Sequence, residues 1–149
     1  MKFHQHQPIH NLNHIKIMQK TPTGNTAFDN KYYYPKKKDG SRVKGHYNHY
    51  RRLSWDKPSR SLTRNNGVIS SLACVHPGKL VRGGNEKNRI YSDPRCFSIE
   101  EICIISSINF QNKLPIDTNQ NLIRTLIGEG IPPLLVKKIF KNLLNNIQL

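Results

Sequence analysis

Acidic residues are scarce in this 149-residue sequence, and long apolar runs are missing from it. Nine Asp and Glu residues stand against 24 Lys and Arg residues, which gives a formal net charge of +15. Residues 1–60 alone carry 13 basic and three acidic side chains, so the excess is concentrated there. We expect a polyanionic partner. No run reaches the roughly 20 apolar residues of a membrane span, and the N-terminal cations lack an interleaved apolar stripe. Nucleic acid is therefore favoured over a membrane surface.

Cysteine is also scarce, and its spacing excludes the usual cysteine-based frameworks. Cys74, Cys96 and Cys103 are odd in number and contain no Cys-x-x-Cys pair, which argues against disulfide scaffolds and zinc ribbons. His10 and His14 have i, i+4 spacing, but neither cysteine nor acidic residues accompany them, so we expect no metal site. No apolar signal segment follows the N-terminus. We expect a protein of the reducing cytoplasm.

Residues 51–64, RRLSWDKPSRSLTR, concentrate four arginines and a lysine around the single tryptophan. Cations, a flat aromatic ring and hydroxyls are groups that grip a phosphate backbone and support bases. Residues 65–67, NNG, predict a turn, and residues 68–73 predict the returning strand of a hairpin. The alternative is a surface hairpin with solvated charges. Trp55 and Pro58 are expected to hold the hairpin in shape.

The order of residues 51–64, then a turn, then VHPG at 75–78, resembles the ninth sequence block of DNA cytosine-5 methyltransferases. That block follows the target-recognition region of those enzymes. Upstream, residues 21–30 form a tight Pro- and Gly-containing loop whose hydroxyls and N–H groups suit phosphates or base edges. Its TPTG sequence is similar to a recognition loop in a subset of the same family.

Between these two segments lies an aromatic and basic stretch, YYYPKKKDG at 32–40, followed by Arg42 and Lys44. Aromatics beside lysines are a common nucleic-acid contact pattern, whereas Asp39-Gly40 is also an ordinary hairpin turn with a solvated tip. Lysine would position the phosphate backbone and not read its sequence.

The C-terminal half has helical patterns after a loop-rich connection at 79–97. Ser98 and Glu101 form a capping box, with Ile99, Ile102, Cys103 and Ile105 facing inward. An Arg-x-Leu-Thr-x-Arg-Glu segment occupies this place in the family. Apolar residues at 122–127 share one face that is predicted to stop at Gly128 in the left-handed conformation. Pro132-Pro133 begins a terminal helix whose predicted buried stripe is Val136, Ile139, Phe140, Leu143 and Leu144.

Residues 127–133, IGEGIPP, resemble the tenth sequence block of the family, a glycine-rich turn before a helix. The resemblance implies that this turn lines a pocket for S-adenosyl-L-methionine, because glycine lets a ligand approach the backbone closely. The expected cofactor-binding residues are Gly128, Glu129, Gly130 and Ile131. The family more often has asparagine where this chain has Glu129, so Glu129 is expected to point elsewhere or toward the amino group of the ligand.

The chemistry of the family is missing from this sequence. Its nucleophile sits in a Pro-Cys dipeptide, and none of the three cysteines follows a proline. The glycine-rich cofactor strand and the Glu-Asn-Val and Gln-x-Arg-x-Arg blocks also have no counterpart. We therefore expect no catalytic residue here, and a second chain or a missing part that carries the cofactor domain and the nucleophile.

The sequence thus predicts the C-terminal portion, or the small subunit, of a DNA cytosine-5 methyltransferase in a restriction-modification setting. The alternatives are a non-catalytic DNA-binding remnant or regulator and a general basic RNA-binding protein. The expected fold is α+β, with a strand-containing recognition part at 1–75 and a helical part at 76–149 that completes the catalytic lobe. The apolar faces at 99–105 and 136–144 are expected to dock on the second chain. The residues expected at double-stranded DNA are Thr21, Thr23, Gly24, Thr26, Lys36, Lys37, Arg42, Arg52, Ser61, Thr63 and Arg64.

Overall fold

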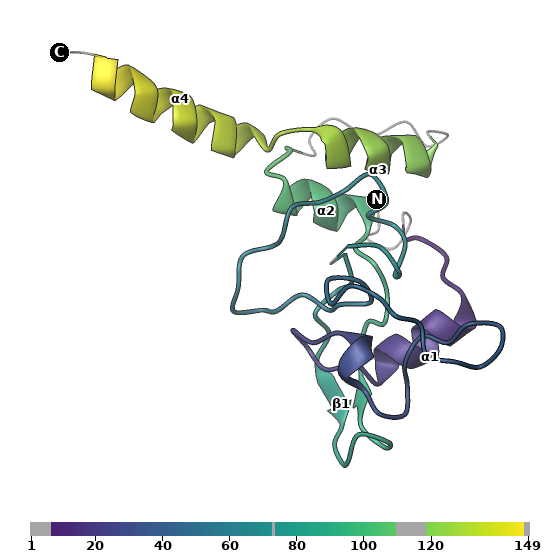
Figure 1. Ribbon diagram of the computed structural model, residues 1–149. Helices are drawn as coiled ribbons and strands as arrows, with labels where there is room; N and C mark the ends of the chain where they lie inside the picture. Colours follow the sequence, from purple (N-terminus) through teal and green to yellow (C-terminus); the bar gives the residue numbers. More distant parts are fainter. Residues whose placement is uncertain (1–6, 73, 110–118, 148–149) are drawn as a thin grey trace.

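The computed structural model describes residues 7–72, 74–109 and 119–147. Its elements follow the order α1 (Leu12–Gln19), the 3-10 helix η1 (Ala27–Asp29), β1 (Leu80–Arg82), β2 (Ile90–Tyr91), α2 (Ile99–Ile105), α3 (Gln120–Glu129) and α4 (Pro133–Ile147). Irregular backbone dominates the N-terminal half, and helices dominate the C-terminal half (Figure 1). The expectation of a mixed α and β protein with a helical C-terminal part is confirmed.

The strands lie elsewhere than predicted. β1 and β2 pair as a two-stranded antiparallel sheet, inside the segment expected to be a loop-rich connection. The described residues of the 1–75 part form isolated bridges and turns instead of strands.

The returning strand predicted at 68–73 is wrong for its described residues, 68–72. The Ser71 N–H donates to the Val68 carbonyl at 2.8 Å, which closes a turn, and Leu72 forms a single bridge with His49. Ile69 is fully buried in this turn, whereas Val68 is 47% exposed. One buried anchor inside a turn produced the short apolar run that we interpreted as a strand.

Helix α1 was not predicted, because its apolar residues are irregularly spaced. Asn11 caps it: its side chain accepts a hydrogen bond from the Asn13 N–H at 2.8 Å. Its last turn inserts Met18, which is fully buried, into the larger core cluster. Tertiary packing at one end therefore stabilises an eight-residue helix that would be marginal alone. The cluster consists of Met18, Ala27, Ile69, Cys74, Val75 and Cys96.

Helix α2 matches its prediction closely. The Ser98 side chain accepts from the Glu101 N–H, and the Glu101 carboxylate accepts from the Ser98 N–H, so the capping box is complete. Ile99, Ile102 and Cys103 are buried, as expected. They pack within this chain, against α3 and the 53–62 segment, so these three side chains are not available to dock on a second chain.

Helix α3 continues past the predicted stop. Gly128 lies inside it, and the C-cap is Gly130 at φ −77°. The left-handed conformation predicted for Gly128 is therefore wrong. Ile123 is buried and Ile127 is half-buried, while Leu122 is 54% exposed, so only part of the predicted apolar face is covered.

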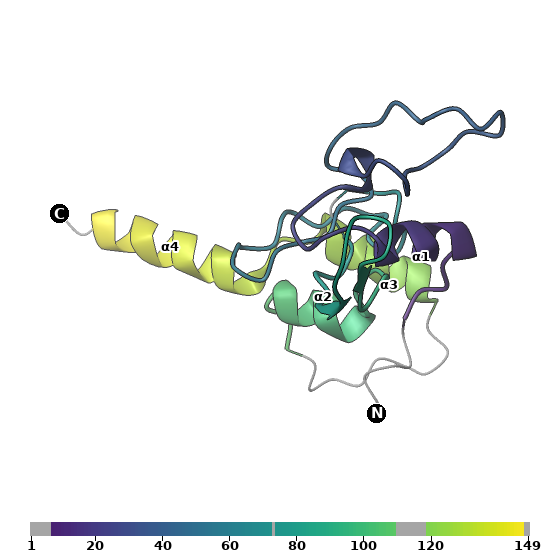
Figure 2. The same ribbon diagram turned by 90° about the horizontal axis from the view of Figure 1, so that it is seen from below.

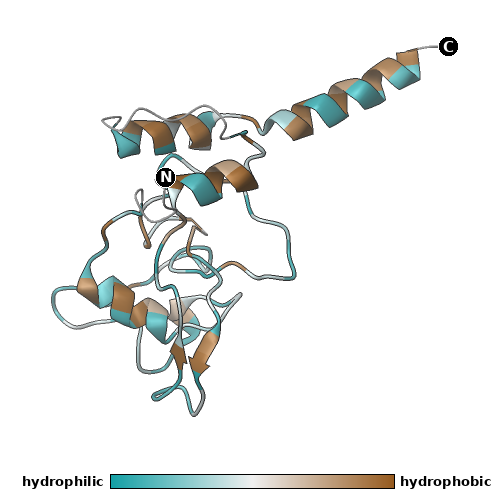
Figure 3. Ribbon diagram, turned by 180° about the vertical axis from the view of Figure 1, so that it is seen from behind, coloured by the Kyte–Doolittle hydropathy of each residue, from teal (hydrophilic) through white to brown (hydrophobic). Residues whose placement is uncertain are grey.

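Helix α4 begins at Pro133, as predicted, but its apolar stripe is not buried within this chain. The helix projects away from the body in both Figure 1 and Figure 2, and none of its residues is buried. Phe140 is 60% exposed and Leu144 62%. Figure 3 shows the hydrophobic residues along α4. Within the described ranges, no helix is long and apolar enough to cross a membrane.

Candidate nucleic-acid and cofactor site

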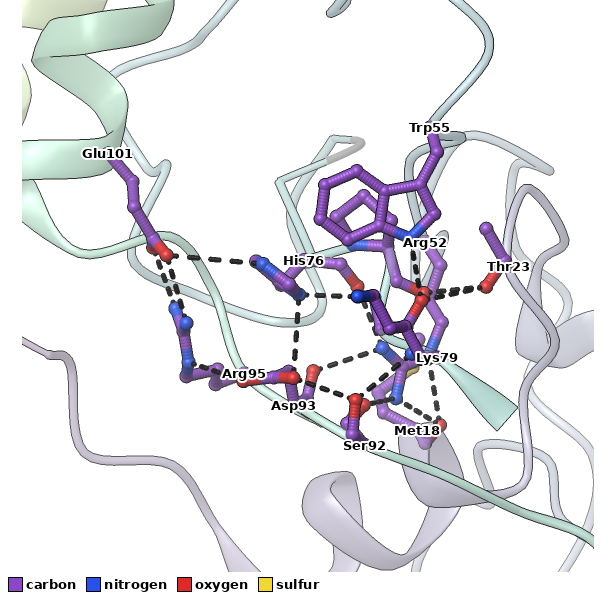
Figure 4. A network of polar contacts seen from close by, with 12 residues as sticks. Met18, Thr23, Arg52, Trp55, His76, Lys79, Ser92, Asp93, Arg95 and Glu101 are labelled. Carbon is purple, nitrogen blue, oxygen red and sulfur yellow. Dashed lines mark hydrogen bonds and ion pairs between the residues drawn. The ribbon is translucent and has the colours of Figure 1, made fainter. Parts of the chain in front are cut away.

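Arg52, predicted to contact DNA, is the polar centre of the fold instead. Its side chain has no exposed surface. The guanidinium donates from Nε and Nη2 to the Met18 carbonyl at 3.2 and 3.0 Å, and from Nη2 to the Ser92 carbonyl at 2.9 Å. Its Nη1 donates to the carbonyls of His76 and Asp93 at 2.7 and 3.0 Å (Figure 4). All five N–H donors are thereby used.

This position corrects the prediction of a DNA contact for Arg52. Burial lowers the pKa of the guanidinium to about 10, and the Asp93 charge partly opposes that effect. The group therefore remains charged at neutral pH, and four carbonyl oxygens replace its water shell. Arg52 ties the end of α1 to the segments after Val75 and after β2, and so it builds the frame on which the exposed residues are held.

A second polar cluster adjoins Arg52 and links it to α2 (Figure 4). Arg95 makes a bidentate pair with Glu101, with Nη1–Oε2 at 2.7 Å and Nη2–Oε1 at 2.9 Å. Its Nε lies 3.4 Å from the Asp93 carboxylate. His76 Nδ1 accepts the Gly78 N–H at 3.1 Å, while its Nε2 lies 4.0 Å from Glu101. Residues 75–78 and residues 95–101 both resemble segments of the family, and in the structure these two segments lie side by side.

Charges within this cluster are fixed by their neighbours. Burial lowers the pKa of His76, Arg95 adds to that effect, and the two carboxylates only partly offset it. The imidazole is therefore neutral at pH 7, consistent with its accepting a backbone N–H. Burial alone would raise the pKa of Glu101, but the Arg95 hydrogen bonds and the Ser98 N–H bring it below its usual value. The cluster is therefore a set of groups that pair and hydrogen-bond with one another.

Trp55 lies over this cluster with one edge bonded and the ring open. Its Nε1–H donates to the Gly78 carbonyl at 2.8 Å, and its ring meets His76 edge-on with centroids 5.4 Å apart. The side chain is nevertheless 59% exposed. The hydrogen bond from the indole N–H anchors Trp55 to Gly78, which suits a ring that holds the 51–78 segment in shape.

The threonine loop splits into buried and accessible members. Thr21 and Thr26 are buried, and their hydroxyls donate to the carbonyls of Ile17 and His49, both at 2.9 Å. Thr23 is half-buried and donates to the Pro77 carbonyl at 2.8 Å. Thr21 and Thr26 thus have structural roles that the sequence pattern did not indicate, and the structure corrects their assignment to a DNA surface.

Gly24 occupies a position that leaves no room for a side chain. Its φ is +76°, and a Cβ there would overlap the Ser54 hydroxyl. Its N–H donates to the Leu53 carbonyl at 3.0 Å, which joins the threonine loop to the 51–64 segment. The two segments that resemble the recognition loop and the ninth block are therefore neighbours.

The basic loop is exposed, as predicted. Lys36 and Lys37 are both accessible, and Gly40 at φ +83° makes the tight turn expected of Asp39-Gly40. Arg42 is also exposed, yet it donates to the carbonyls of Phe28 and Asn30 at 3.0 and 3.1 Å. Figure 2 shows this loop extending from the body beyond η1.

The residues expected at DNA and at the cofactor meet at the end of α3. Arg64 Nε lies 3.1 Å from the Glu129 carboxylate, and both side chains are largely exposed. Gly128 packs so tightly on the Thr63 backbone that a Cβ would overlap the Thr63 carbonyl. The Thr63 hydroxyl is buried without a hydrogen-bond partner. Glu129 therefore points toward the 61–64 segment. This agrees with the first of the two expected orientations, in which Glu129 points away from the cofactor.

Asn66 and Arg124 fasten this junction, and sequence reasoning overlooked both. The Asn66 amide donates to the Thr63 carbonyl at 2.8 Å and to the Arg124 carbonyl at 2.9 Å. Arg124 returns a bond from Nη1 to the Asn66 side chain at 3.1 Å and reaches the Phe97 carbonyl with Nη2 at 2.9 Å. The NNG turn was the available signal, because a buried Asn in a turn commonly bonds neighbouring backbone.

Beside this junction, the glycine-proline turn borders an apolar hollow of about 210 Å³. Gly130, Ile131 and the two following prolines line it, together with Ser106, Ile108, Leu126 and Ile127. Two of the four expected cofactor residues, Gly130 and Ile131, thus border a depression, while Gly128 and Glu129 face the 61–64 segment. The hollow is smaller than the roughly 300–1,000 Å³ typical of ligand pockets.

None of the three cysteines has the surroundings of a nucleophile. All are free and buried, and Cys74 Sγ lies 3.5 Å from Cys96 Sγ. Burial raises the pKa of Cys96, and burial raises that of Cys103 to about 11. These two thiols are therefore protonated at pH 7, and a buried protonated thiol is a poor nucleophile. The described residues also contain no group of three or more His, Cys, Asp or Glu able to hold a metal ion.

Comparison with known proteins gives one informative relative. The chain is 40% identical over 136 residues to the type II methyltransferase M1.HgaI of Avibacterium volantium, a match that spans 91% of this chain. It covers 37% of that protein, so the chain spans little more than a third of its relative's length. No family model matches the chain, and no solved structure matches it. The similarity supports a methyltransferase relationship.

Proposed function

We propose that this chain is the C-terminal portion, or the small subunit, of a DNA cytosine-5 methyltransferase. It binds duplex DNA and supplies one wall of the S-adenosyl-L-methionine pocket in a restriction-modification setting. The observation that carries the proposal is the match of nearly the whole chain to about a third of a type II methyltransferase. The matched residues include the segments that resemble the recognition loop and the ninth and tenth blocks of the cytosine-5 family.

The proposed DNA surface uses the accessible members of the predicted set. Lys36, Lys37 and Arg64 are exposed cations, and Ser61 is an exposed hydroxyl. Cations on a projecting loop neutralise phosphates without regard to sequence, which gives salt-dependent affinity. Thr63 also belongs to the predicted set, but its hydroxyl is buried, so it is not part of this accessible surface. Arg52, Thr21 and Thr26 are buried and are not part of this surface.

The proposed cofactor wall is the turn at 130–133. Its apolar lining and the side-chain-free backbone of Gly130 fit the flat and aliphatic parts of a nucleoside-derived ligand. The ligand supplies the methyl group, and these residues would exclude water from one side of it. The hollow holds only about 210 Å³, so the remaining walls must come from another polypeptide or a missing part.

The exposed stripe of α4 is the proposed contact with that complementary part. A 15-residue helix with apolar residues exposed along its length tends to associate with another apolar surface in water. The match covers 37% of the relative, and we propose that the part of the enzyme corresponding to the rest of the relative covers this stripe.

Co-expression with the complementary part of M1.HgaI, the part outside the matched region, tests the proposal. The purified pair should transfer a radiolabelled methyl group from S-adenosyl-L-methionine to duplex DNA, and hydrolysis of the product should yield 5-methylcytosine. The single chain should bind duplex DNA but transfer nothing. N4-methylcytosine or N6-methyladenine as the product would reject the cytosine-5 assignment.

The alternative, a non-catalytic DNA-binding remnant or regulator, predicts a different result from the same experiment. The chain would bind duplex DNA, yet no complementary part would associate with it or restore transfer. The exposed cations alone support this reading equally well. The turn at 130–133 favours the enzyme, because a binding module has no use for a cofactor wall.

A further inference from the structure

A hollow of about 500 Å³ lies between α1 and the aromatic segment 32–35, apart from the junction of α3 with the 61–64 segment. From α1 it is lined by Asn13, His14 and Lys16. From the other side it is lined by the three consecutive tyrosines, with Lys36 and Val43 beside them. Its size falls in the range of small-ligand sites.

The lining contains aromatic, amide and cationic side chains but no acidic ones. It has aromatic rings for stacking, Asn side chains that donate and accept hydrogen bonds, and two lysines that attract an anion. None of the residues that line it is acidic. A ligand that carries both a flat heteroaromatic ring and a negative charge fits this set.

The backbone of the aromatic segment and the Tyr34 ring are held in place before any ligand arrives. The Asn30 side-chain oxygen accepts the N–H groups of Tyr32 and Tyr33 at 2.9 and 3.0 Å. The Arg42 guanidinium stacks over the Tyr34 ring at 3.8 Å from its centroid. Tyr32 itself is 56% exposed, which leaves its ring available for stacking. A backbone that is already fixed reduces the ordering cost of binding.

The inner wall is uncharged at neutral pH. His14 Nε2 and the Tyr50 hydroxyl are hydrogen-bonded at 3.1 Å, and their rings meet edge-on. Burial lowers the pKa of His14 and raises that of Tyr50, so both are neutral near pH 7. The positive charge at the mouth therefore comes from Lys16 and Lys36, which leaves the interior suited to a base and the rim suited to its phosphate.

We propose that this hollow binds a nucleotide: an unpaired base between α1 and Tyr32, with the adjoining phosphate at Lys16 and Lys36. This goes beyond duplex binding, since a paired and stacked base cannot enter a pocket. The nucleotide chemistry has two sources, a free mononucleotide or an extrahelical base in a DNA strand. The basic loop that borders the hollow favours the strand, because the same cations that hold a duplex would lie beside the displaced base.

The test measures binding by the full chain to three probes: a perfect duplex, the same duplex with one extra unpaired nucleotide, and cytidine or adenosine monophosphate. Fluorescence anisotropy serves for the duplexes and calorimetry for the mononucleotides. Tighter binding to the bulged duplex than to the perfect one supports an extrahelical base. Binding of mononucleotides without a bulge preference supports a free nucleotide.

Matched tyrosine variants locate the effect. Tyr32→Ala should remove the bulge preference, or weaken mononucleotide binding, by on the order of tenfold, the usual contribution of one stacked base. Tyr47→Ala is the control, because Tyr47 is 66% exposed and lies outside the lining. Lys16→Gln, compared with Lys57→Gln, provides a second pair at exposed positions that do not endanger folding.

Equal effects of Tyr32→Ala and Tyr47→Ala would overturn the proposal, as would equal affinity for both duplexes together with no mononucleotide binding. Failure of the proposed methyltransferase role has a separate signature. It would appear as no methyl transfer by the reconstituted pair, and it would leave the Tyr32 result unchanged.

Discussion

Replacing Arg52 separates a structural arginine from a DNA-contacting one. The sequence pattern placed Arg52 at the DNA, whereas the structure buries it among four backbone carbonyls, those of Met18, His76, Ser92 and Asp93. The informative change is Arg52→Lys, which keeps the charge and removes the planar fork. A DNA contact would tolerate this change with a modest loss of affinity. A buried hub would not tolerate it.

The magnitude follows from the number of carbonyls. An ammonium has three N–H donors in place of five, so at least one of the four carbonyls loses its partner. A buried polar group without a partner costs roughly 1–3 kcal/mol, and the shorter side chain adds imperfect geometry. We expect Arg52→Lys to lower the free energy of unfolding by about 2–4 kcal/mol. Arg52→Met would leave all four unpaired, at roughly 4–12 kcal/mol, which is comparable to the whole stability of a small domain.

Urea unfolding followed by circular dichroism measures this difference. Arg51→Lys is the matched control, because Arg51 is only half-buried and makes a single 3.4 Å bond to the Tyr47 carbonyl. Its free energy of unfolding should change by no more than about 0.5 kcal/mol. If Arg52→Lys unfolds at the same urea concentration as the unaltered chain but binds duplex DNA more weakly, the assignment of Arg52 as a structural hub is refuted.

Three further changes probe other parts of the structure. Gly128→Ala should destabilise the chain by about 1–3 kcal/mol in urea unfolding, despite the better helix propensity of alanine, because its Cβ would overlap the Thr63 carbonyl. Gly83→Ala is the control, because a Cβ there meets open space, and it should leave the stability unchanged. Equal losses of stability in the two variants would contradict the close packing of Gly128 on Thr63. Burial lowers the pKa of His10 from 6.5 to about 4. Between these two pH values the unfolded chain therefore carries a proton on His10 that the folded chain lacks. Stability should be complete above about pH 6.5 and fall toward pH 4, by about 1–2 kcal/mol after solvent screening of the half-buried ring, and His10→Gln should remove that part of the pH dependence. Phe140→Ser should leave the unfolding of the single chain unchanged within about 0.5 kcal/mol, yet reduce co-purification of the complementary part; a large loss of stability in the single chain would mean that α4 packs on the body.

Features set by neighbouring residues could be predicted from the sequence. The capping box of Ser98 and Glu101 depends on residues three apart, and the start of α4 at Pro133 depends on the fixed φ of proline. The turn at Gly40 likewise depends on one residue that tolerates a positive φ. In each case the determining interaction lies within one turn of backbone, so no knowledge of the tertiary structure was required.

Features set by distant residues could not be predicted. Gly128 was interpreted as a helix end because glycine often serves that purpose, but its role is to let α3 approach Thr63, some 65 positions earlier in the chain. α1 was missed for a related reason: its stability depends on Met18 entering a core assembled from residues as far away as Cys96. The candidate DNA residues divided in the same way, since a buried threonine and an exposed one have the same sequence signature.

Arginines and lysines have different roles in this structure, which explains why charge alone did not predict which cationic side chains are exposed. Several described arginines are used internally: Arg52 bonds backbone carbonyls, Arg95 pairs with Glu101, and Arg124 bonds Asn66. A guanidinium suits such positions, because its planar fork satisfies several acceptors at once. The lysines of the projecting loop at 36–38 are exposed and strongly hydrated, which suits transient binding to phosphates. The +15 charge therefore combines arginines that hold the fold together internally with lysines that remain exposed. Replacing the three loop lysines with glutamine should weaken duplex binding according to how many phosphates those lysines neutralise, with a shallower salt dependence and unchanged urea unfolding, whereas an unchanged salt slope would place the DNA on another face.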